Sequence, residues 1–290
     1  MRVLVVGAAS WNTLLHLPAL PPPRSHSLVA DRTVETVGGT SAGKALNLAA
    51  LGHEVHLHTL LGHDVEGSRV RDHLAAAGIH LHVDPSVTGT EQHVNLMARD
   101  GGRLSIYRSV LTPRPDLDLR PLVGRAGTCD AVVLDIADYA RGLIPLLAEA
   151  GIGFWSDLHD WDGRQPHHRD FAEAAHALVL SADALPDPGL LCRRLSGDGR
   201  LVVCTDGARG ATAYVGEREV VVPAEPAGEV VDTNGAGDAF LAGLLHGSLL
   251  GWPLERSLHA GAVAGAAVVG VDGLADARLT AAVLERATAG

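Results

Sequence analysis

Short apolar runs alternate with helical patterns along the whole chain of 290 residues. Apolar runs of this kind are typical of strands buried on both faces of a parallel sheet, and the helical patterns between them supply the crossovers. Strands are expected at residues 3–6, 55–60, 131–134, 153–155, 177–180 and 201–204, with further strand-like runs at 219–222 and 229–231. Helices are expected at residues 41–51, 65–77, 140–150, 237–250, 254–269 and 279–287. The pattern predicts one α/β unit that spans residues 1–290.

Two stretches of the chain do not follow this alternation. Residues 12–37 carry the proline-rich run PALPPPRSHS, and residues 88–110 contain two alternating runs that flank a turn. Asp100, Gly101 and Gly102 are expected to supply the positive φ angles of a hairpin turn there. We therefore expect the two insertions to pair into a small sheet that lies beside the main sheet as a lid.

Composition limits the partners and the setting of the protein. With 47% apolar residues the chain can bury a core, and its formal net charge of -11 disfavours nucleic acid and anionic membranes, which bind through clustered Lys and Arg. Three widely spaced cysteines fit neither a disulfide framework nor a CxxC metal site. No signal-peptide pattern opens the chain, and no apolar run is long enough to cross a membrane. These features predict a cytoplasmic protein with a small-molecule ligand.

The sharpest local pattern is VDTNGAGDAF at residues 231–240, a glycine-rich turn before a long helical pattern. The amide groups of Gly235, Ala236 and Gly237 are expected to be free at the helix N-terminus, where they and the helix dipole favour an anion such as phosphate. Asp238 then lies in the first turn, placed to accept a proton from a hydroxyl group. The alternative is that Asp238 is an ordinary N-terminal helix acid and the glycines only form a turn.

A second glycine-rich run, GGTSAGKA at residues 38–45, fits two interpretations. Its spacing up to Lys44 matches the first seven positions of a phosphate-binding P-loop, and the AVVLD run that ends at Asp135 imitates the acidic strand of such proteins. A P-loop needs Ser or Thr after the lysine to bind Mg²⁺, which Ala45 cannot do. The P-loop interpretation would also leave the motif at residues 231–240 without a function.

Both motifs resemble the signatures of the ribokinase-like (PfkB) carbohydrate kinase family. DTNGAGDAF matches the second signature, DTxGAGDxF, at every defining position, and the Gly38-Gly39 pair with the closing Leu51-Gly52 is similar to the first. The resemblance implies an α/β fold with three layers, a doubly wound and mostly parallel sheet, and a small β lid. It also implies that Asp238 is the catalytic base and that the amides before it form an anion hole.

The resemblance further implies which residues contact the acceptor substrate. In the family the glycine pair, here Gly38 and Gly39, lies at the hinge of the lid and faces the acceptor. Asn12 stands nearest to the place of an acid that binds substrate hydroxyls, and Gly43 stands where relatives commonly have Asn. Lys44 is the only lysine of the chain, and it is expected either to replace a lost contact or to extend into solvent.

The nucleotide site also follows from the resemblance. The run TDGARG at residues 205–210 is similar to the T-x-G-x-x-G loop with which the family binds nucleotide. Thr205 and Gly207 are therefore expected to contact ATP, together with Thr233 and Asn234. A turn without a ligand is the alternative for the loop at residues 205–210.

Mg²⁺ is expected to accompany ATP, but its ligands are less evident. Many relatives help to hold the ion with an N-x-x-E element, and residues 181–184 read SADA in its place. Asp157 and Asp183 are the carboxylates expected to serve instead, because Mg²⁺ needs one or two carboxylates besides phosphate and water oxygens. A monovalent cation near Asp232 and Asn234 is expected by analogy with several relatives.

These features favour an ATP-dependent kinase that phosphorylates a hydroxymethyl group of a sugar or related small polyol. A nucleoside kinase of the same family is one alternative, with Trp11 or Trp155 stacking on the base, although only 3% of the residues are aromatic. A sugar- or nucleotide-binding protein of the same fold that has lost turnover is another. An NAD oxidoreductase is disfavoured, because no GxGxxG follows the first strand. A homodimer through the lid is expected, because exposed sheet edges need cover.

Overall fold

The computed structural model describes residues 1–99, 101–228 and 232–289 of the chain. Its main feature is a sheet with the strand order β13-β12-β11-β10-β9-β8-β1-β4-β5. The pairs among β5, β4, β1, β8, β9, β10 and β11 are parallel, and β12 and β13 add an antiparallel edge. The strands are β1 Arg2–Val6, β4 Glu54–Leu61, β5 His80–Pro85, β8 Ala131–Leu134, β9 Trp155–Asp157, β10 Ala177–Ser181, β11 Leu201–Thr205, β12 Ala211–Val215 and β13 Arg218–Val222.

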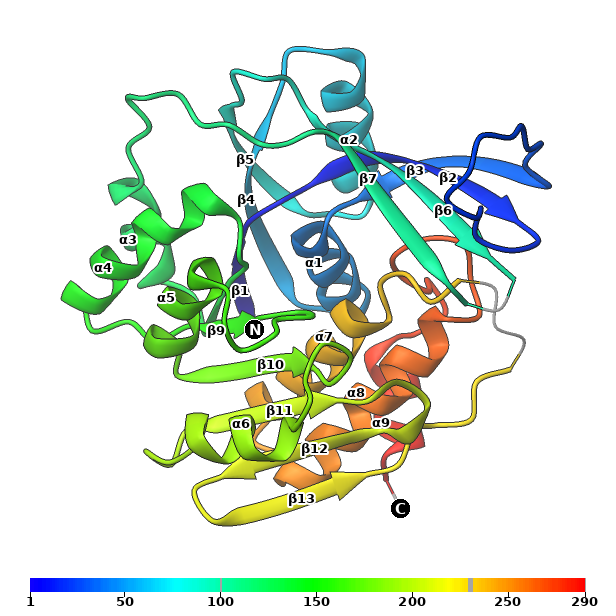
Figure 1. The fold of residues 1–290 in the computed structure, drawn as a ribbon. Coiled ribbons are helices and arrows are strands. Elements are labelled where there is room, and N and C mark those ends of the chain that lie inside the picture. The colour runs from blue at the N-terminus through cyan, green and yellow to red at the C-terminus, as the bar shows by residue number, and fades with distance from the viewer. Residues whose placement is uncertain (100, 229–231, 290) are drawn as a thin grey trace.

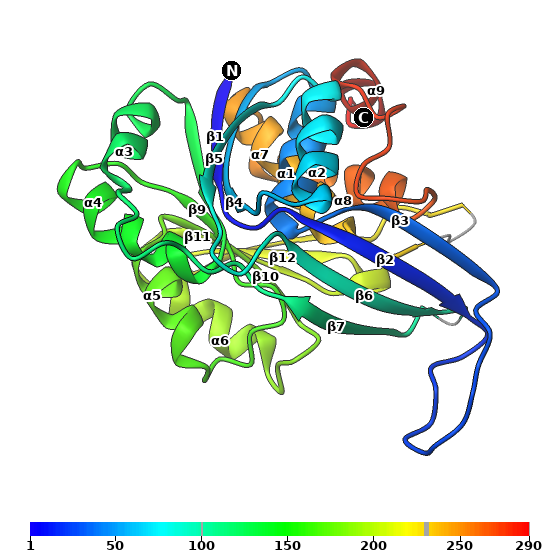
Figure 2. The same cartoon turned by 90° about the horizontal axis from the view of Figure 1, so that it is seen from above.

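Helices cover both faces of this sheet (Figures 1 and 2). One face carries α1 Thr40–Ala50, α2 Val65–Ala76, α7 Ala236–Leu249, α8 Leu254–Val268 and α9 Ala281–Ala287. The other face carries α3 Arg120–Ala126, α4 Leu143–Glu149, α5 Pro166–Ala174 and α6 Pro188–Leu195. Each face buries its own apolar cluster against the sheet. The three-layer, doubly wound fold that the sequence predicts is confirmed.

The helices α1, α7 and α8 bury many of their residues. α1 buries every residue from Ser41 to Leu48 because it lies between the sheet and α7. Small side chains let α7 and α8 approach each other closely, since a Cβ on Gly243 or Gly247 would collide with α8. Close helix packing of this kind brings the N-terminal halves of α1 and α7 together at one end of the sheet.

The order of the strands fixes where a ligand site can form. The chain begins with β1 in the interior of the sheet, continues to β4 and β5 on one side, and then returns to β8 and β9 on the other. The chain leaves β1 to reach α1 on one face of the sheet, and it leaves β8 to reach α4 on the other face. In doubly wound sheets this switch point opens a crevice in which ligands bind.

A second, four-stranded sheet with the order β3-β2-β6-β7 projects beyond the layers (Figures 1 and 2). It consists of β2 Ser10–Leu17, β3 Arg32–Gly38, β6 Glu91–Ala98 and β7 Arg103–Ser109. β6 and β7 fall within the insertion expected at residues 88–110, whereas β2 begins two residues before the insertion expected at 12–37 and β3 ends one residue after it. At the turn before β7 only Gly101, with φ +87°, has the expected positive φ, because Gly102 is not among the positive-φ glycines and Asp100 lies outside the described residues.

Several boundaries differ from the sequence-based expectations. The strand expected at residues 153–155 begins at Trp155, and the helix expected at 140–150 divides into a 3-10 turn, Asp138–Gly142, and α4. The helices α3, α5 and α6 were not expected, because seven to nine residues give too few turns for a clear apolar period. The strand-like run at 219–222 lies within β13, and the run at 229–231 is outside the described residues.

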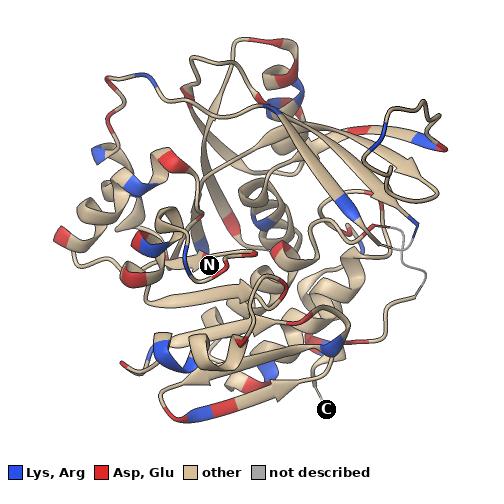
Figure 3. Cartoon of the chain, viewed as in Figure 1, with Lys and Arg blue, Asp and Glu red and all other residues tan. Residues whose placement is uncertain are grey.

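Charged residues are distributed over separate elements. Figure 3 shows Lys and Arg on the outer helices, the edge strand and the small sheet, without one continuous basic face in this view. In the described part of the chain, no helix is both long and apolar enough to cross a bilayer.

The first prediction concerns the Asp64 side chain, which joins the start of α2 to the start of the β6 segment. Its oxygens accept bonds from the amide of Gly67 at 2.8 Å and from the amide and hydroxyl of Thr90 at 2.8 and 2.6 Å. Loss of this helix cap in Asp64→Ala should lower the free energy of unfolding by ~1–2 kcal/mol, measured by urea denaturation at pH 7.

The difference between wild type and Asp64→Ala should also depend on pH. Burial alone would raise the pKa of Asp64, but the bonds from Thr90 and Gly67 outweigh it and hold the pKa below its ordinary value. The contribution is therefore present above pH ~4 and should fade as the pH falls below that value. Asp72→Ala, on the exposed face of the same helix, is the matched control and should change stability by less than ~0.5 kcal/mol. Equal losses in the two variants would contradict the capping role.

Candidate active site

The N-terminus of α7 has the features expected of an anion site. Gly235 caps the helix with φ +82°, a left-handed conformation that glycine adopts without strain, and it packs against Leu274. Within the described residues the amides of Gly235 and Gly237 have no backbone acceptor, whereas the amide of Ala236 lies 3.5 Å from the carbonyl of Thr233. Two of the three amides that the sequence singled out are therefore free for an anion.

Asp238 lies in the first turn of α7 and is almost fully buried. Its Oδ1 accepts a hydrogen bond of 2.7 Å from Nζ of Lys44, which comes from α1. The same Nζ lies 3.4 Å from Asp135 and 3.1 Å from Asp157. These carboxylates follow or end the neighbouring strands β8 and β9, so the lysine joins two helices to two strands at the switch point of the sheet.

His159 completes this buried charge network. Its Nε2 lies 2.9 Å from Oδ1 of Asp135, and its Nδ1 lies 3.5 Å from Oδ2 of Asp157. Its φ is +50°, the one positive value outside glycine in the described part of the chain. A non-glycine residue in this region is strained, so the bonds that His159 makes to both aspartates must hold it in place. We call Lys44, Asp135, Asp157, His159 and Asp238 the buried charge network.

Burial and neighbouring charges shift the pKa values of this network in different directions. Burial raises the pKa of Asp238 to about 6, although Lys44 and His159 partly oppose it. For Asp135, Lys44 and His159 outweigh burial and hold the pKa below its ordinary value. Burial would lower the pKa of His159, but Asp157 and Asp135 raise it to about 9. At neutral pH the network therefore holds two cations, and Asp238 accepts a proton more readily than Asp135 does.

Gly43 and Gly38 make room for the polar side chains of the site. A Cβ on Gly43 would lie 2.5 Å from Oδ2 of Asp238, so this position has space for no side chain. A Cβ on Gly38 would overlap the amide of Asn12, which is buried and whose Oδ1 accepts a bond of 2.8 Å from Ser10. Gly39, with φ +90°, begins α1. The acceptor-site candidates of the sequence are thus neighbours of Asp238 or of the small sheet.

Lys44 is not placed as the sequence suggested. Its side chain has no exposed surface, and its ammonium group faces three carboxylates. It donates hydrogen bonds to Asp135 and Asp238, pairs with Asp157 and is fully enclosed, so an acceptor hydroxyl cannot reach it. Lys44 therefore binds the carboxylate of Asp238 and does not replace a lost contact to the substrate.

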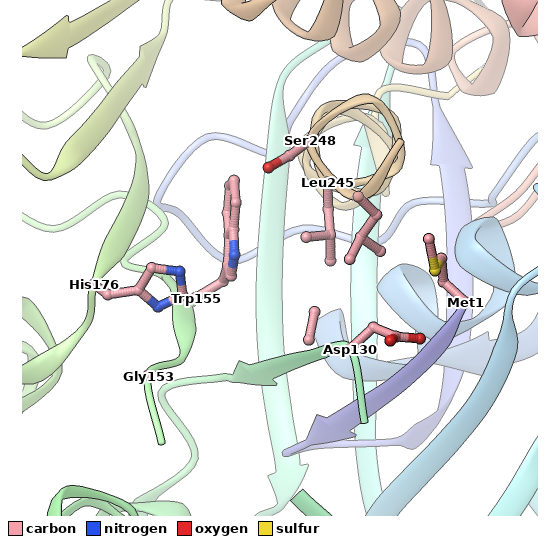
Figure 4. Close-up of a pocket in the computed structure, with 9 residues that line it drawn as sticks. Met1, Asp130, Gly153, Trp155, His176, Leu245 and Ser248 are labelled. Atoms are coloured by element: carbon pink, nitrogen blue, oxygen red, sulfur yellow. The ribbon is translucent and has the colours of Figure 1, made fainter. Parts of the chain in front are cut away.

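The two tryptophans considered for stacking lie elsewhere. Trp11 alternates with Asn12 along β2, so it points to the opposite face of the small sheet, where Arg69 of α2 covers its ring at 5.3 Å. Trp155 lies at the beginning of β9, away from the carboxyl end that carries Asp157. It lines a cavity of about 420 Å³ with His176 (Figure 4). The stacking expectation for both residues is therefore wrong.

The face of the small sheet that carries Asn12 is polar and largely covered. His93 and Asn95 of β6 share this face with Asn12 and Leu14, their partners in the register, and Asn95 is 3% exposed with its Oδ1 unbonded among the described residues. The ring of Tyr107 on β7 lies tilted against that of His93, with 4.0 Å between the ring centroids, and Tyr107 is 59% exposed at the margin of this face. Amide, imidazole and phenol groups on one face suit a hydroxyl-rich ligand.

Two bonds tie the far end of the small sheet to the body. Arg103 of β7 donates to Oδ1 of Asn234 at 2.9 Å, and Arg32 of β3 pairs with Asp272 at 2.6 Å. Between them lies a cleft of about 350 Å³, whose lining residues include Asp232 and Thr233. The expected nucleotide residue Asn234 therefore already bonds to the small sheet.

The loop after β11 carries the remaining nucleotide candidates. Thr205 ends β11, its hydroxyl donates to the carbonyl of Leu180 at 3.3 Å, and Gly207 follows with φ +50°. β11 is two strands from β9, which places the loop about 10 Å along the sheet from Asp157. The loop faces the same edge of the sheet as Asp238 without touching it.

The structure distinguishes the two carboxylates expected at Mg²⁺. Asp157 is already paired with Lys44 and His159, so it belongs to the buried charge network and does not suit a metal ion. Asp183 lies in the exposed turn after β10, within electrostatic reach of Arg209 in the loop after β11. No cluster of three or more potential metal ligands occurs among the described residues. Asp183 alone fits an ion that phosphate oxygens would mainly hold.

Sequence analysis did not identify Asp135 and His159 as site residues. Asp135 was considered only as the acidic residue of the P-loop interpretation, and His159 does not belong to any local sequence motif. A usable signal existed, because polar residues at the carboxyl ends of neighbouring parallel strands meet at one edge of the sheet. Asp135 and Asp157 both stand at such ends.

A buried acid beside free helix amides, at the switch point of a doubly wound sheet, suits the transfer of a phosphoryl group to a hydroxyl. The model of the pfkB family of carbohydrate kinases matches residues 2–111 and 190–281, and the chain belongs to this family. The family resemblance drawn from the two signatures is therefore confirmed, and so is the reaction class.

Curated relatives and solved structures agree with this assignment. Acarbose 7(IV)-phosphotransferase of Actinoplanes sp. is 38% identical over 271 residues, which cover 91% of this chain and 90% of the relative. The microbiome-derived acarbose kinase Mak1 has a TM-score of 0.88 and 31% identity over 100% of this chain and 99% of that chain. A nucleoside kinase of Burkholderia thailandensis in complex with inosine has a TM-score of 0.80 at 20% identity, over 99% and 96% of the chains. The last likeness shows the fold alone.

The second prediction concerns Gly43. In Gly43→Ala the new methyl group would lie 2.5 Å from Oδ2 of Asp238 and must displace that carboxylate. We expect kcat to fall roughly 100-fold while the fold is kept, because a shift of about 1 Å at a reacting group can cost that much. Steady-state kinetics and thermal unfolding, with an acceptor that the wild type turns over, measure both effects.

Gly124→Ala is the matched control for this substitution. Gly124 lies inside α3, and a Cβ there would meet no atom within 4 Å. Alanine favours helices over glycine by about 1 kcal/mol, so this variant should keep full activity and be slightly more stable. Unchanged kcat in Gly43→Ala would show that the packing of Gly43 against the base is unimportant.

Proposed function

We propose that this kinase transfers the γ-phosphoryl group of ATP to a hydroxymethyl group of a carbohydrate, with Asp238 as the general base. The observation that carries the proposal is the position of Asp238, buried in the first turn of α7 beside the free amides of Gly235 and Gly237. Burial raises the pKa of this carboxyl to about 6, close to the pH of a cell, where a general base is most effective.

The geometry supports a simple division of roles. Asp238 takes the proton of the acceptor hydroxyl as its oxygen attacks the γ-phosphorus, and the bond to the β-phosphate oxygen breaks on the opposite side. The amides of Gly235 and Gly237 stabilise the negative charge on the transferring group. Mg²⁺ would neutralise phosphate charge, with Asp183 as the protein ligand that the structure leaves available.

The nucleotide is proposed to lie along the carboxyl edge of the sheet. Thr205 and Gly207 of the loop after β11, and Thr233 beside α7, are the residues proposed to contact it. Asn234 would contribute through its backbone, because its side chain already accepts the bond from Arg103. This arrangement directs the terminal phosphate towards the amides of α7.

We propose acarbose or a similar polyhydroxylated oligosaccharide as the acceptor. The names of the two acarbose kinases, at 38% and 31% identity over nearly the whole chain, support this choice. The polar face of the small sheet, with Asn12, His93 and Asn95, offers hydrogen-bonding groups for many hydroxyls. A nucleoside is less well supported, because Trp11 and Trp155 point away from this face.

The small sheet, within insertions 12–37 and 88–110, is proposed to act as a lid over the acceptor. Its contacts through Arg32 and Arg103 hold its far end against the body. A closed lid excludes water, which would otherwise accept the phosphoryl group.

The outer face of the lid sheet is proposed to join two copies of the chain. Leu104 and Ile106 on β7 are each 48% exposed, and their partners in the register, Leu96 and Val94 of β6, lie on the same face. A contiguous apolar face of this kind would be covered in a homodimer.

A monovalent cation near Asp232 is part of the proposal. Asp232 is 3% exposed; its Oδ1 accepts a bond of 2.7 Å from the amide of Asn234, and its Oδ2 has no partner among the described residues. Burial raises the pKa of this carboxyl. A buried carboxylate oxygen without a donor fits a cation with oxygen ligands.

The third prediction tests the base. Asp238→Asn should reduce acceptor-dependent ATP consumption by ~10²–10⁴-fold, because the amide cannot take the proton. In the wild type, log kcat/KM should fall with unit slope as the pH drops below about 6, the pKa at which burial places Asp238. A coupled ADP assay across pH 5 to 9 with acarbose, ribose, fructose and inosine measures both effects.

Two comparisons make this test decisive. Asp116→Asn changes an exposed aspartate in the loop before α3 and should keep full activity. An ATP analogue should still raise the melting temperature of Asp238→Asn, because the amides of α7 remain. Equal turnover in wild type and Asp238→Asn would refute the assignment of the base, and turnover of inosine alone would establish the nucleoside alternative. A wild type that binds ATP without consuming it would identify a binding protein.

The fourth prediction tests the cation. Replacing K⁺ by tetramethylammonium at constant ionic strength should lower wild-type kcat/KM several-fold, and Asp232→Asn should abolish the response. If the wild type is equally active in both salts, the cation proposal fails. Asp232→Asn should also lose any K⁺-dependent rise in melting temperature, which separates binding of the ion from catalysis.

A further inference from the structure

The carboxylate proposed as the base is bound by the only lysine of the chain. Lys44 has no exposed surface, and its ammonium nitrogen lies 2.7, 3.1 and 3.4 Å from carboxylate oxygens of Asp238, Asp157 and Asp135. An ammonium group in such a position cannot reach solvent or a second ligand without breaking these pairs. Its role must be exerted through the carboxylates that it contacts.

The charges of the buried network explain which group can take a proton. Lys44 and His159 supply two positive charges, and the three aspartates supply three negative ones. The network therefore carries one net negative charge while Asp238 is ionised and none after Asp238 has accepted a proton. Uptake of the hydroxyl proton brings the buried site to neutrality, which a low-dielectric environment favours.

We propose that Lys44 is a positioning residue for the general base, which holds Asp238 through Oδ1, keeps its carboxylate ionised in a buried position, and leaves Oδ2 to receive the proton. This inference rests on the proposed role of Asp238. It adds a function for Lys44. The preceding residue, Gly43, has no side chain and so leaves space for Oδ2 of Asp238.

Each element around Asp238 contributes to its ionisation. Lys44 reaches it from α1, Asp157 from β9 and His159 from the turn after β9, while Asp135 at the end of β8 acts by holding Lys44 and His159. Burial and Asp157 raise the pKa of Asp238, whereas Lys44 and His159 lower it. Removal of Lys44 would leave one cation against three carboxylates, so the pKa of Asp238 must rise further.

Lys44→Met tests the inference, because methionine keeps most of the volume and removes the charge. The acid limb of kcat/KM should move up by about 1–3 pH units, the usual effect of an opposite charge within 6 Å. At pH 7 the loss should then be about twofold for a shift of one unit and about 90-fold for a shift of three, and it should diminish as the pH is raised. The pKa of Asp238 itself, followed by carbon-13 carboxyl NMR in the protein without substrates, should rise by the same amount.

Two further variants separate charge from packing. Lys44→Met combined with Asp157→Asn restores one net negative charge, so the pKa of Asp238 and the acid limb should return towards the wild-type values. Asn47→Ala removes the bonds of a buried amide one turn along α1, 2.8 Å to Gly43 and 2.7 Å to Leu274, without changing any charge. It should lower stability and leave the acid limb in place. The double variant also serves if Lys44→Met alone does not fold.

Two results would overturn the inference. A higher KM for the acceptor in Lys44→Met with an unmoved acid limb would identify Lys44 as a substrate contact. If Lys44→Met lost the same fraction of kcat at every pH and the pKa of Asp238 measured by NMR did not change, the role of Lys44 would be only structural. The NMR measurement needs no turnover, so it decides the effect of Lys44 on Asp238 even if the wild type proves to phosphorylate none of the acceptors and the proposed function fails.

Discussion

The ion pairs of Lys44 with three aspartates are the interaction on which the site depends. A buried charge is stable only when its partners are all in place, and removal of one partner of such a pair typically costs 3–5 kcal/mol. The partners come from α7, β8 and β9, so the network forms only after the two helices and the sheet have packed together. The small residues of α1 and α7 allow that approach, which makes the chemistry of the site a product of helix packing.

The doubly wound order of the strands places this network where a substrate can reach it. Asp135 and Asp157 stand at the carboxyl ends of adjacent strands, and both insertions that form the small sheet leave the main sheet at the same edge, after β1 and after β5. The free amides of α7, the buried carboxylate of Asp238 and the polar face of the small sheet therefore converge from segments far apart in the chain. This convergence explains why one fold can keep the reaction and vary the acceptor through the insertions.

Much of the fold and the position of Asp238 could be predicted from the sequence, because apolar runs and the motif at residues 231–240 are local patterns. The partners of Lys44 could not be predicted, because they are distant in the sequence. The nearest of them, Asp135, is 91 positions from Lys44. Trp11 was assigned to the wrong face because one position along a strand reverses the direction of a side chain. The strand at Trp155–Asp157 has three residues, too few for a period to mark its ends.

The burial of the single lysine has a consequence for the chemical reactivity of the whole protein. Reagents that acylate amines, and enzymes that modify lysine, would find no lysine on the surface of the folded chain. Acylation of Lys44 requires that α1 separate from α7 and expose the amine. The extent of acylation at this position therefore measures how often the site opens, in a protein that carries no other lysine to obscure it.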